Sequence, residues 1–406
     1  MRRVVVSGGG VFCALGVEWG GILAKLRLCR NAVCRMEAWD SYEGIHTRLA
    51  APIYEALPEY PRKQTRGMGR VALLALAATE SALRKAGLEE APLLRNGRCG
   101  VAYGSSLGSV PPLMDFYRLL VEGNSAAMSA TTYIKAMPHT CAANLEVYYG
   151  LTGRLMSTNT ACTSGSMAIG YAYEAIRHGQ QELMLAGGAE ELSLADVAVF
   201  DTLFATSTRN EAPEQTPAAY DRGRDGLVVG EGAGTLVLEE YNHAVARGAH
   251  IYAEVVGFGT NTDGAHITQP NRATMQRALW LALEDAGLSP EAIGYINTHG
   301  TATGVGDIAE SHATREVFRR PVAVSTLKNY IGHTLGACGA IEAWLTINML
   351  NEGWFAPNIN LRELDTACAE LDYLTGTGRA MEVEYVMSNN FAFGGINTSL
   401  VFKRPR

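Results

Sequence analysis

The sequence predicts an α/β protein built from two related halves. Short β-rich apolar runs alternate with segments of helical periodicity along most of the 406 residues. In both halves a strand and a loop lead into a helix that starts with small residues, at Ser164-Gly165-Ser166 and again at Gly336-Ala337-Cys338. Since no low-complexity or charged linker separates these halves, we expect residues 1–250 and 251–406 to form two βαβ-rich halves that meet at one site.

Each expected element follows from a local pattern. Apolar, β-rich runs bounded by glycine or polar residues predict strands over residues 3–7, 99–103, 183–186, 235–239, 252–257, 292–298, 322–325 and 398–402. Apolar residues at helical spacing predict helices over 68–86, 164–178, 272–286, 307–318 and 336–350. The first of these helices should stop at Gly87, because glycine commonly follows the last turn.

Composition excludes several classes of protein. Hydrophobic residues make up 47% of the chain, enough for a large core, and 34 basic against 41 acidic residues give a net charge of −7, which argues against nonspecific nucleic-acid binding. No run approaches the ~20 apolar residues of a membrane span, and the run Val4-Val5-Val6 is too short for an export signal. The eight cysteines show neither C-x-x-C nor zinc spacing. We expect a soluble cytoplasmic protein with reduced thiols and no metal.

Two glycine-rich segments resemble nucleotide-binding loops only superficially. In the first, Gly8-Gly9-Gly10, Cys13 takes the last glycine position of G-x-G-x-x-G and no clear helix follows, so we interpret it as a turn after a strand. The second, residues 226–234, lacks the Lys-Ser/Thr ending of a phosphate loop and is interpreted as a hairpin. The sequence therefore predicts no nucleotide site.

Cys162 is the first candidate for chemistry. It follows a polar turn and precedes a predicted helix, where the helix dipole and free backbone N–H groups favour a thiolate. Gly165 and its small neighbours leave room for a substrate. A buried structural cysteine is the alternative for any one cysteine, so the interpretation depends on what accompanies Cys162.

Two histidines and a lysine occupy equivalent loop positions. His299 follows a predicted strand, at the carboxyl end where α/β proteins form ligand crevices. Lys328 precedes His333 by five residues after another strand. Asp307 and Glu310 fall at a helix start after His299 and could pair with a cation such as Lys328. A glycine hinge with aromatic residues, 391–397, precedes the last strand.

One cysteine, two histidines and a lysine suit a thioester Claisen condensation. The cysteine holds an acyl chain as a thioester. Two neutral imidazole N–H donors bind a carbonyl oxygen and stabilise the enolate that forms when a carboxylate leaves as carbon dioxide. A cysteine protease would use one histidine and an asparagine, and would not need the second His-Lys loop.

These motifs resemble the β-ketoacyl-acyl carrier protein synthases, the condensing enzymes of fatty-acid and type II polyketide assembly. The resemblance runs nearly end to end, and residues 186–191 and 246–254 are most similar to the synthase I/II branch. The resemblance rests on TACTSG at Cys162, YDRGRDG at 220–226, HGTATGVGD from His299, K-x-x-x-GH ending at His333, and FAFGGIN. The initiating synthase III branch uses Cys-His-Asn, so the second histidine excludes that branch. The resemblance implies a thiolase-like fold, with two related halves in a layered α-β-α-β-α arrangement.

The resemblance also implies roles for the residues of the site. Cys162 would be the acylated nucleophile, with its own N–H and that of Phe393 as an oxyanion hole. His299 and His333 would bind the malonyl carbonyl, and Lys328, paired with Glu310, would fix His333. The remaining expected contributors are Asp307 in support, Thr301 and Thr303 on the phosphopantetheine arm, Phe393 as acyl gate, and Phe391 and Gly394 against substrate.

Partners follow from the same resemblance. No bound cofactor is expected, because the acyl carrier protein itself carries the phosphopantetheine arm. The carrier is acidic, so Arg62, Lys63 and Arg66, extended by Arg70, are its expected docking patch. A dimer is expected, either of two identical chains or with a ketosynthase-like chain-length factor, with the segment before Cys162 at the interface.

Some positions depart from the usual pattern. The gating loop usually reads S-F-G-F-G-G, but Asn390 and Ala392 replace its serine and first glycine, and alanine does not take positive φ cheaply. Gly304 replaces the proline of HGT-x-T-P. These departures count against a housekeeping fatty-acid role, and the sequence leaves fatty-acid synthesis and a specialised polyketide or polyene pathway both open. A chain-length-factor-like subunit would lack the nucleophile, and a thiolase would need a second cysteine within 391–397, where there is none.

Overall fold

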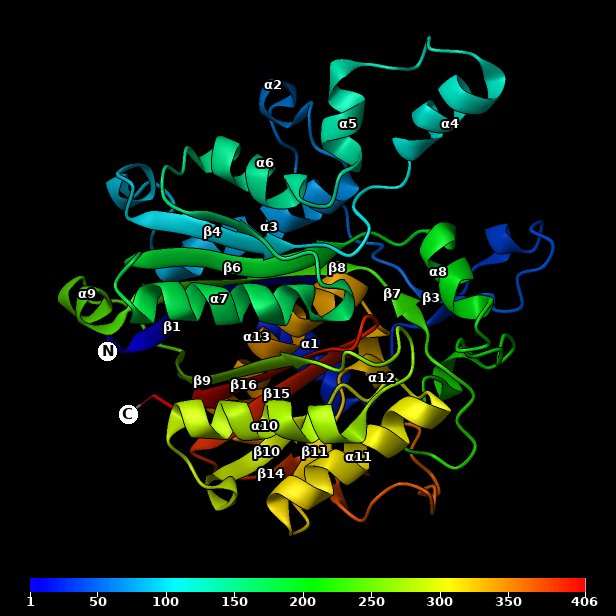
Figure 1. Cartoon of the computed structure of the whole chain (residues 1–406), viewed down its shortest axis with the longest axis vertical. Helices are drawn as coiled ribbons and strands as arrows, with labels where there is room; N and C mark the ends of the chain where they lie inside the picture. The colour runs from blue at the N-terminus through cyan, green and yellow to red at the C-terminus, as the bar shows by residue number, and fades with distance from the viewer. Residues whose placement is uncertain (406) are drawn as a thin grey trace.

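Five layers of helix and sheet stack on one another in the computed structural model, which describes residues 1–405 (Figure 1). One half of the sheet contains β1 (Val4–Cys13), β4 (Cys99–Gly104), β5 (Leu155–Ser157), β6 (Leu183–Glu190) and β8 (Gly232–Glu240). The other contains β9 (Ala253–Thr262), β10 (Ile293–Asn297), β11 (Ala323–Ser325), β13 (Asp372–Tyr373), β15 (Tyr385–Ala392) and β16 (Ile396–Lys403). These halves join where β1 pairs with β9, from Val4–Val255 to Val6–Ala253.

Both halves have the same strand order. Hydrogen bonding runs β5-β4-β6-β8-β1 in the first and β11-β10-β15-β16-β9 in the second, with β13 at the outer edge. When β13 is left out and the other five strands of each half are numbered along the chain, both orders are third, second, fourth, fifth, first. The predicted α/β fold class with two related βαβ-rich halves is confirmed.

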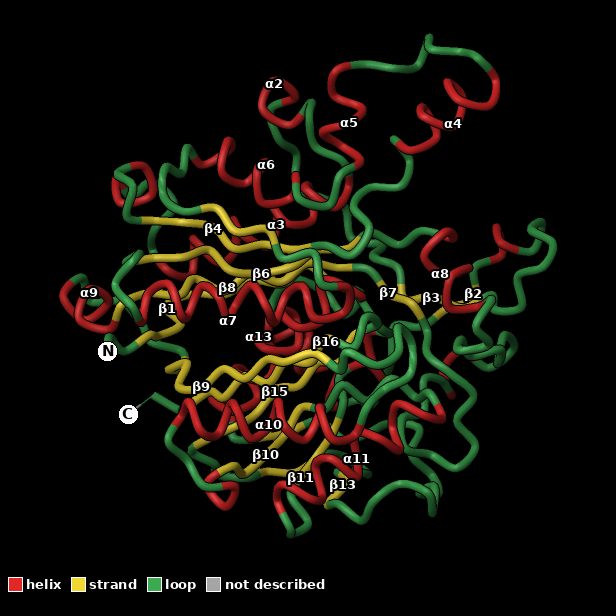
Figure 2. Tube along the Cα trace, viewed as in Figure 1, coloured by secondary structure: helices red, strands yellow, loops and turns green. Residues whose placement is uncertain are grey.

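Helices form three layers around these sheets (Figures 1 and 2). The outer layers are α3 (Arg70–Ala86) with α6 (Thr140–Tyr149), and α10 (Arg272–Ala286) with α11 (Gly304–Phe318), while α7 (Ser164–Arg177) and α13 (Cys338–Glu352) lie in the middle. Peripheral elements are α1 (Trp19–Arg27), α2 (Arg62–Thr65), α4 (Leu113–Glu122), α5 (Ala130–Ala136), α8 (Leu194–Asp201), α9 (Tyr241–Ala246), α12 (Lys328–Ile331), β2 (Cys34–Arg35), β3 (Leu49–Ala51), β7 (Val229–Gly230), β12 (Trp354–Phe355) and β14 (Arg379–Ala380). In residues 1–405 no helix has both the length and the apolar character to cross a membrane.

The middle helices touch backbone to backbone. A Cβ on Gly165 of α7 would lie 2.8 Å from the backbone N of Ala340, and one on Gly339 of α13 would lie 2.5 Å from that of Ser166. Both distances are far below van der Waals contact. All residues of α13 from Cys338 to Leu350 are buried. The starts of both helices therefore meet in the centre of the molecule.

The glycine-rich turn expected after a short first strand is wrong. Residues 8–10 lie inside β1, which continues to Cys13. A Cβ on Gly8 would lie 2.4 Å from Ala82 O of α3, and a Cβ on Gly9 would lie 2.2 Å from the Trp344 ring of α13. These glycines allow helices to pack closely on both faces of the strand. In the second half, Gly257 of β9 meets the carbonyl of Ala282 of α10 in the same way, at 2.3 Å.

Two further expectations are corrected. Residues 226–234 do not form a hairpin, because β7 pairs in parallel with β3 and β8 joins the large sheet. The hinge before the last strand is shorter than expected: residues up to Ala392 belong to β15, an interior strand in which Asn389 and Asn390 are fully buried. Burial in the sheet overrides the low strand propensity of asparagine there. Only residues 393–395 form the turn.

Candidate active site

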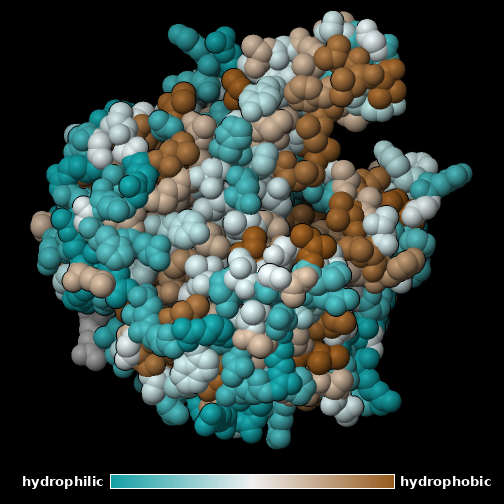
Figure 3. Space-filling model, in the orientation of Figure 1, coloured by the Kyte–Doolittle hydropathy of each residue, from teal (hydrophilic) through white to brown (hydrophobic). Residues whose placement is uncertain are grey.

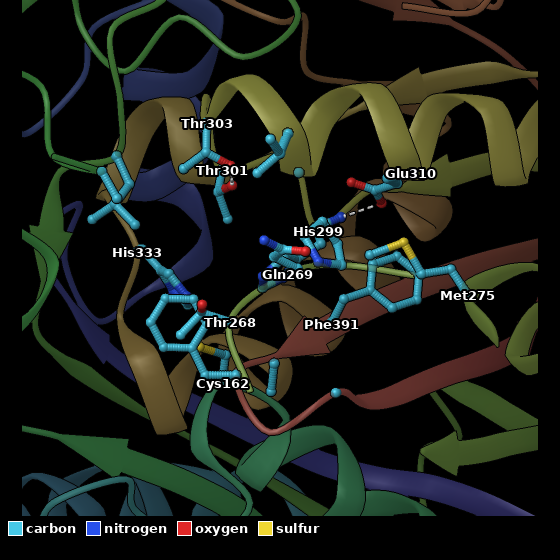
Figure 4. A pocket seen from close by; sticks show the side chains of 18 of the residues that line it. Cys162, Thr268, Gln269, Met275, His299, Thr301, Thr303, Glu310, His333 and Phe391 are labelled. Atoms are coloured by element: carbon cyan, nitrogen blue, oxygen red, sulfur yellow. Dashed lines mark hydrogen bonds between the residues drawn. The ribbon is translucent and has the colours of Figure 1, made fainter. Parts of the chain in front are cut away.

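The structure brings Cys162, His299 and His333 to one pocket of about 280 Å³ (Figure 4). The cysteine comes from the first half of the chain and the histidines from the second, so the pocket lies where the halves meet. Other lining residues predicted from the sequence are Thr301, Thr303, Glu310, Phe391 and Phe393.

Cys162 lies in a 3₁₀ turn, residues 161–163, that leads directly into α7. Ala161 before it takes φ 49°, a left-handed conformation that is uncommon for alanine. Burial raises the pKa of the Cys162 thiol to about 11. The charge of Lys328 and the backbone N–H groups of Phe393 and Cys162 act in the opposite direction, so both N–H groups lie close to the sulfur.

His333 is fixed by its backbone and by its ring. Gly332 before it has φ 67° and forms the tight turn expected there. The His333 N–H donates to Val228 O at 2.7 Å, and its carbonyl accepts from Gly230 N at 2.9 Å. Leu335 N donates to His333 Nδ1 at 3.2 Å, so Nδ1 is the acceptor and the neutral ring carries its proton on Nε2.

His299 follows β10, and Glu310 of α11 holds its loop. The backbone N–H groups of His299 and Gly300 donate to the two carboxylate oxygens of Glu310 at 2.7 and 2.8 Å (Figure 4). The His299 ring lies 5.2 Å from that of His333, nearly perpendicular, and its buried Nδ1 has no partner among residues 1–405. Burial lowers the pKa of both imidazoles well below the usual value, and the nearby charge of Lys328 lowers it further. Both rings are neutral at pH 7.

The expected pairing of Lys328 with Glu310 is wrong. Lys328 Nζ donates to Glu342 Oε1 of α13 at 2.5 Å, with both side chains fully buried. Burial alone would lower the pKa of Lys328, but the charge of Glu342 raises it above the usual lysine value. Glu310 is occupied by the His299 loop, and burial raises its pKa to about 7. The sequence signal for Glu342 is that it is the only charged residue in the apolar stretch 338–350.

Asp307 does not pair with Lys328 either. It accepts from Tyr220 N at 2.7 Å and Ala302 N at 3.1 Å and lies 3.5 Å from the Arg224 guanidinium. Burial raises its pKa to about 6. Asp307 therefore braces the loop after His299 and is not part of the lysine ion pair.

Four more side chains named from the sequence line the pocket: Thr301, Thr303, Phe391 and Phe393. Thr301 and Thr303 hydrogen-bond each other through their hydroxyls at 2.9 Å, and Phe391 lies 6.1 Å from the His299 ring. Phe393 packs on Phe200 of α8 at 5.4 Å, a contact that sequence reasoning missed because no motif marks position 200.

The β15–β16 turn is not strained by its alanine. Gly394 and Gly395 take φ 86° and 69°, whereas Ala392 lies in the strand without positive φ. The Gly394 N–H donates to Ile267 O at 2.7 Å. The expected penalty at Ala392 is therefore absent from this conformation of the turn.

The basic patch lies outside the pocket. Arg62 and Lys63 are exposed on α2, and Arg66 is exposed directly after it. Arg70 is not a free cation, because its Nε lies 2.9 Å from Glu231 Oε2. Three of the four basic side chains thus remain available to a partner.

The layered fold, with a cysteine and two neutral imidazoles in one central pocket, defines a condensing acyltransferase of the thiolase-like class. The family model "Beta-ketoacyl synthase, N-terminal domain" matches residues 1–244, and "Beta-ketoacyl synthase, C-terminal domain" matches residues 252–362. The chain belongs to the beta-ketoacyl synthase family.

Relatives match over the whole chain. The chain is 38% identical to 3-oxoacyl-(acyl-carrier-protein) synthase 2 of Vibrio cholerae serotype O1, with 99% of each covered. It is 37% identical to synthase 1 of Escherichia coli K12, over 100% of this chain and 99% of the relative. A crystal structure of a beta-ketoacyl synthase from Burkholderia phymatum STM815 has 58% identity and a TM-score of 0.99, with both chains fully covered. A ketosynthase in complex with its chain length factor from Xenorhabdus doucetiae has 28% identity and a TM-score of 0.84, over 100% and 98%.

Proposed function

We propose that this chain is an elongating β-ketoacyl-acyl carrier protein synthase, which joins an acyl group on Cys162 to a malonyl thioester with loss of carbon dioxide. The observation that carries the proposal is the shared pocket of Cys162, His299 and His333, in which two backbone N–H groups lie close to the sulfur and both imidazoles are neutral.

The first step is transfer of the acyl group to Cys162. The sulfur attacks the carbonyl carbon of the acyl-carrier thioester, the new C–S bond forms, and the bond to the carrier thiol breaks. The proton of the Cys162 thiol leaves with the carrier thiol. During the attack the carbonyl oxygen becomes an oxyanion, which the backbone N–H groups of Cys162 and Phe393, both close to the sulfur, would stabilise.

The second step forms the carbon–carbon bond. His299 and His333 donate to the thioester carbonyl of malonyl-carrier, whose carboxylate leaves as carbon dioxide, and its electron pair remains as an enolate. The enolate carbon attacks the acyl carbonyl on Cys162. The C–S bond breaks and leaves a thiolate that takes up one proton from solvent, and the β-ketoacyl group stays on the carrier.

The remaining pocket residues serve binding. Thr301 and Thr303 at the mouth would hydrogen-bond the phosphopantetheine arm, which arrives with the carrier, so the reaction needs no resident cofactor. Phe391, Phe393 and Gly394 would border the acyl chain.

All eight cysteines are free thiols, which fits a reducing cytoplasm.

The acyl-enzyme is the direct test of this function. After brief exposure to an acyl-carrier thioester, mass spectrometry should find one acyl adduct, on Cys162. Cys338 is the most demanding internal control, because it is buried beside Cys162 and its Sγ lies 3.2 Å from Cys162 O. Burial raises the pKa of Cys338 well above the usual value, so it should stay unlabelled. An adduct elsewhere with Cys162 free would refute the assignment.

A panel of acyl chains in this assay would separate fatty-acid from specialised polyketide or polyene substrates.

Docking of the acidic carrier should depend on the exposed patch of Arg62, Lys63 and Arg66. Steering by surface charge acts on encounter and weakens with salt. We expect Arg62→Glu with Lys63→Glu to raise the KM for carrier-bound substrate at low salt, while small soluble thioesters react as before. Steady-state kinetics with both substrates over a salt series measure the effect. Unchanged carrier kinetics at low salt would place docking elsewhere, and equal losses would indicate damaged folding or catalysis.

A partner subunit is proposed from two surfaces. The strand β5 ends the sheet and comes just before Cys162. Helix α4 has no buried residue, and Leu120 and Val121 on it are 81% and 64% exposed. Apolar side chains also gather on the lobe that projects at the top of Figure 3. Such a patch typically marks an interface. Native mass spectrometry, alone and with a ketosynthase-like paralogue, distinguishes a homodimer from a pair with a chain-length factor.

A further inference from the structure

A buried amide of β15 contacts the carboxylate that pairs with Lys328. Asn390 is fully buried, and its Nδ2 donates to Glu342 Oε2 at 2.9 Å. Lys328 donates to the other oxygen, Oε1, at 2.5 Å, and Asn297 Nδ2 lies 3.3 Å from Oε2. Glu342 therefore has a cation on one oxygen and amide N–H groups on the other, an arrangement that suits its ionised form.

The backbone holds this amide in place. Asn390 is paired with Thr398 of β16, whose hydroxyl donates to the Asn390 carbonyl at 3.2 Å. On the facing helix, a Cβ on Gly339 would lie 2.8 Å from Asn390 Oδ1, so glycine makes the room that the side chain occupies. Asn390 directly precedes Phe391, which lines the pocket.

We propose that Asn390 is a positioning residue that keeps Glu342 ionised and, through it, keeps Lys328 charged beside Cys162. This inference deepens the proposed function and rests on it. The synthases that the sequence resembles usually have serine here, which lacks the NH₂ group that makes this contact.

The sign of the effect follows from the charges. A hydrogen bond to a carboxylate favours the charged form, so removing the Asn390 amide raises the pKa of Glu342. A neutral Glu342 stabilises the Lys328 ammonium less, so burial lowers the pKa of Lys328 and favours the neutral amine. Cys162 loses a nearby positive charge and its thiol pKa rises. The other titratable groups that act on this pair and on the thiol are Cys338, Glu310 and Glu190, and Lys328 also acts on His299 and His333.

Thiol reactivity tests the inference without any carrier substrate. We expect Asn390→Leu to move the pH midpoint for alkylation of Cys162 by iodoacetamide upward by about half a unit or more, which is about threefold slower labelling at a fixed pH below the midpoint. Labelling of the full chain is followed by mass spectrometry of the Cys162 peptide. Asn348→Leu is the control, because Asn348 is another buried asparagine, on α13, whose amide donates to Trp344 O at 2.7 Å and, among residues 1–405, to no carboxylate. Its profile should overlap the parent profile.

Two more variants separate charge from packing. In a Glu342→Gln background Asn390→Leu should add no further shift, because its effect passes through Glu342. In Asn390→Asp a second carboxylate faces Glu342. As the introduced carboxyl group ionises with rising pH, alkylation of Cys162 should become increasingly slower than in the parent protein. This variant carries the test if Asn390→Leu does not fold.

Three outcomes would overturn the inference: a parent-like profile in folded Asn390→Leu, a parent-like profile in Asn390→Asp, or a full additional shift in the Glu342→Gln background. Failure of the parent to condense acyl and malonyl carriers would refute the proposed function instead, and it leaves this readout intact.

Discussion

Cys162→Ala is expected to abolish condensation and to leave malonyl decarboxylation measurable. Without the sulfur no acyl-enzyme forms, so the enolate has no acyl carbonyl to attack. Both histidines remain, and they are the groups that stabilise the enolate. The variant should therefore release carbon dioxide from malonyl-carrier and produce an acetyl-carrier in place of a β-ketoacyl-carrier.

Product mass spectrometry and carbon dioxide release measure these two reactions separately. Cys141→Ala is a suitable control, because Cys141 is also buried but lies on α6, away from the pocket; it should condense at the parent rate. Condensation at an appreciable rate by Cys162→Ala would show that the acyl group is held elsewhere.

The two histidines should each be needed for decarboxylation. Loss of one preorganised donor to a developing oxyanion typically costs about 10²- to 10³-fold. His299→Ala and His333→Ala should lose malonyl decarboxylation by factors of that order while folding normally, as judged by thermal melting. His312→Ala, on α11, should keep the parent rate, because His312 is not among the residues that line the pocket and its Nε2 hydrogen-bonds Ala367 O. Parent-like decarboxylation in either site variant would exclude that histidine as a donor.

Decarboxylation should also have an acid limb in its pH dependence. Burial lowers the pKa of His299 and His333 well below 6.5, so both rings stay neutral above that pH and protonate only in more acid solution. The histidines themselves should therefore cause no loss of rate above about pH 6.5 and a loss below it. Glu310, which holds the His299 loop, has a pKa raised to about 7, so its protonation should start the fall in rate near neutral pH. The Cys162 thiol behaves oppositely: its pKa is raised to about 11, so its alkylation should still increase with pH through the alkaline range.

The residues of the pocket could be predicted because each lies in a short motif with its own local geometry. A helix start, a strand end and a glycine turn place Cys162, His299 and His333, and these features depend on near neighbours in the sequence. The partner of Lys328 could not be found in this way. Glu310 follows the His299 motif closely, but its oxygens are taken by two backbone N–H groups. Glu342 lies 14 residues after Lys328, and the two side chains meet only because the fold brings α13 next to the lysine.

Helices and strands could be predicted where the hydrophobic periodicity is strong. The predictions failed where tertiary packing decides the structure. The α10 bounds agree with the pattern, and α3 starts two residues later than expected. The strand β15 could not be seen from Ser388-Asn389-Asn390, because polar residues rarely form a buried strand. The glycines of β1 predict a turn by their local pattern, and this prediction is wrong. The sequence alone does not show that a helix packs closely on each face of the strand.

The contact of α7 and α13 through Gly165 and Gly339 has a consequence for how this site can diverge. The separation between the nucleophile at the start of one helix and the lysine–carboxylate pair beside the other is set by main-chain contact, with no side chain in between to act as a spacer. A substitution elsewhere in the core changes that separation only if it moves one of these two main chains. The pocket walls on α8 and the β15–β16 turn are built from side chains such as Phe200 and Phe393. Acyl selectivity can therefore drift at these walls while the reacting atoms keep their spacing, so chemistry and substrate choice are separable in this fold.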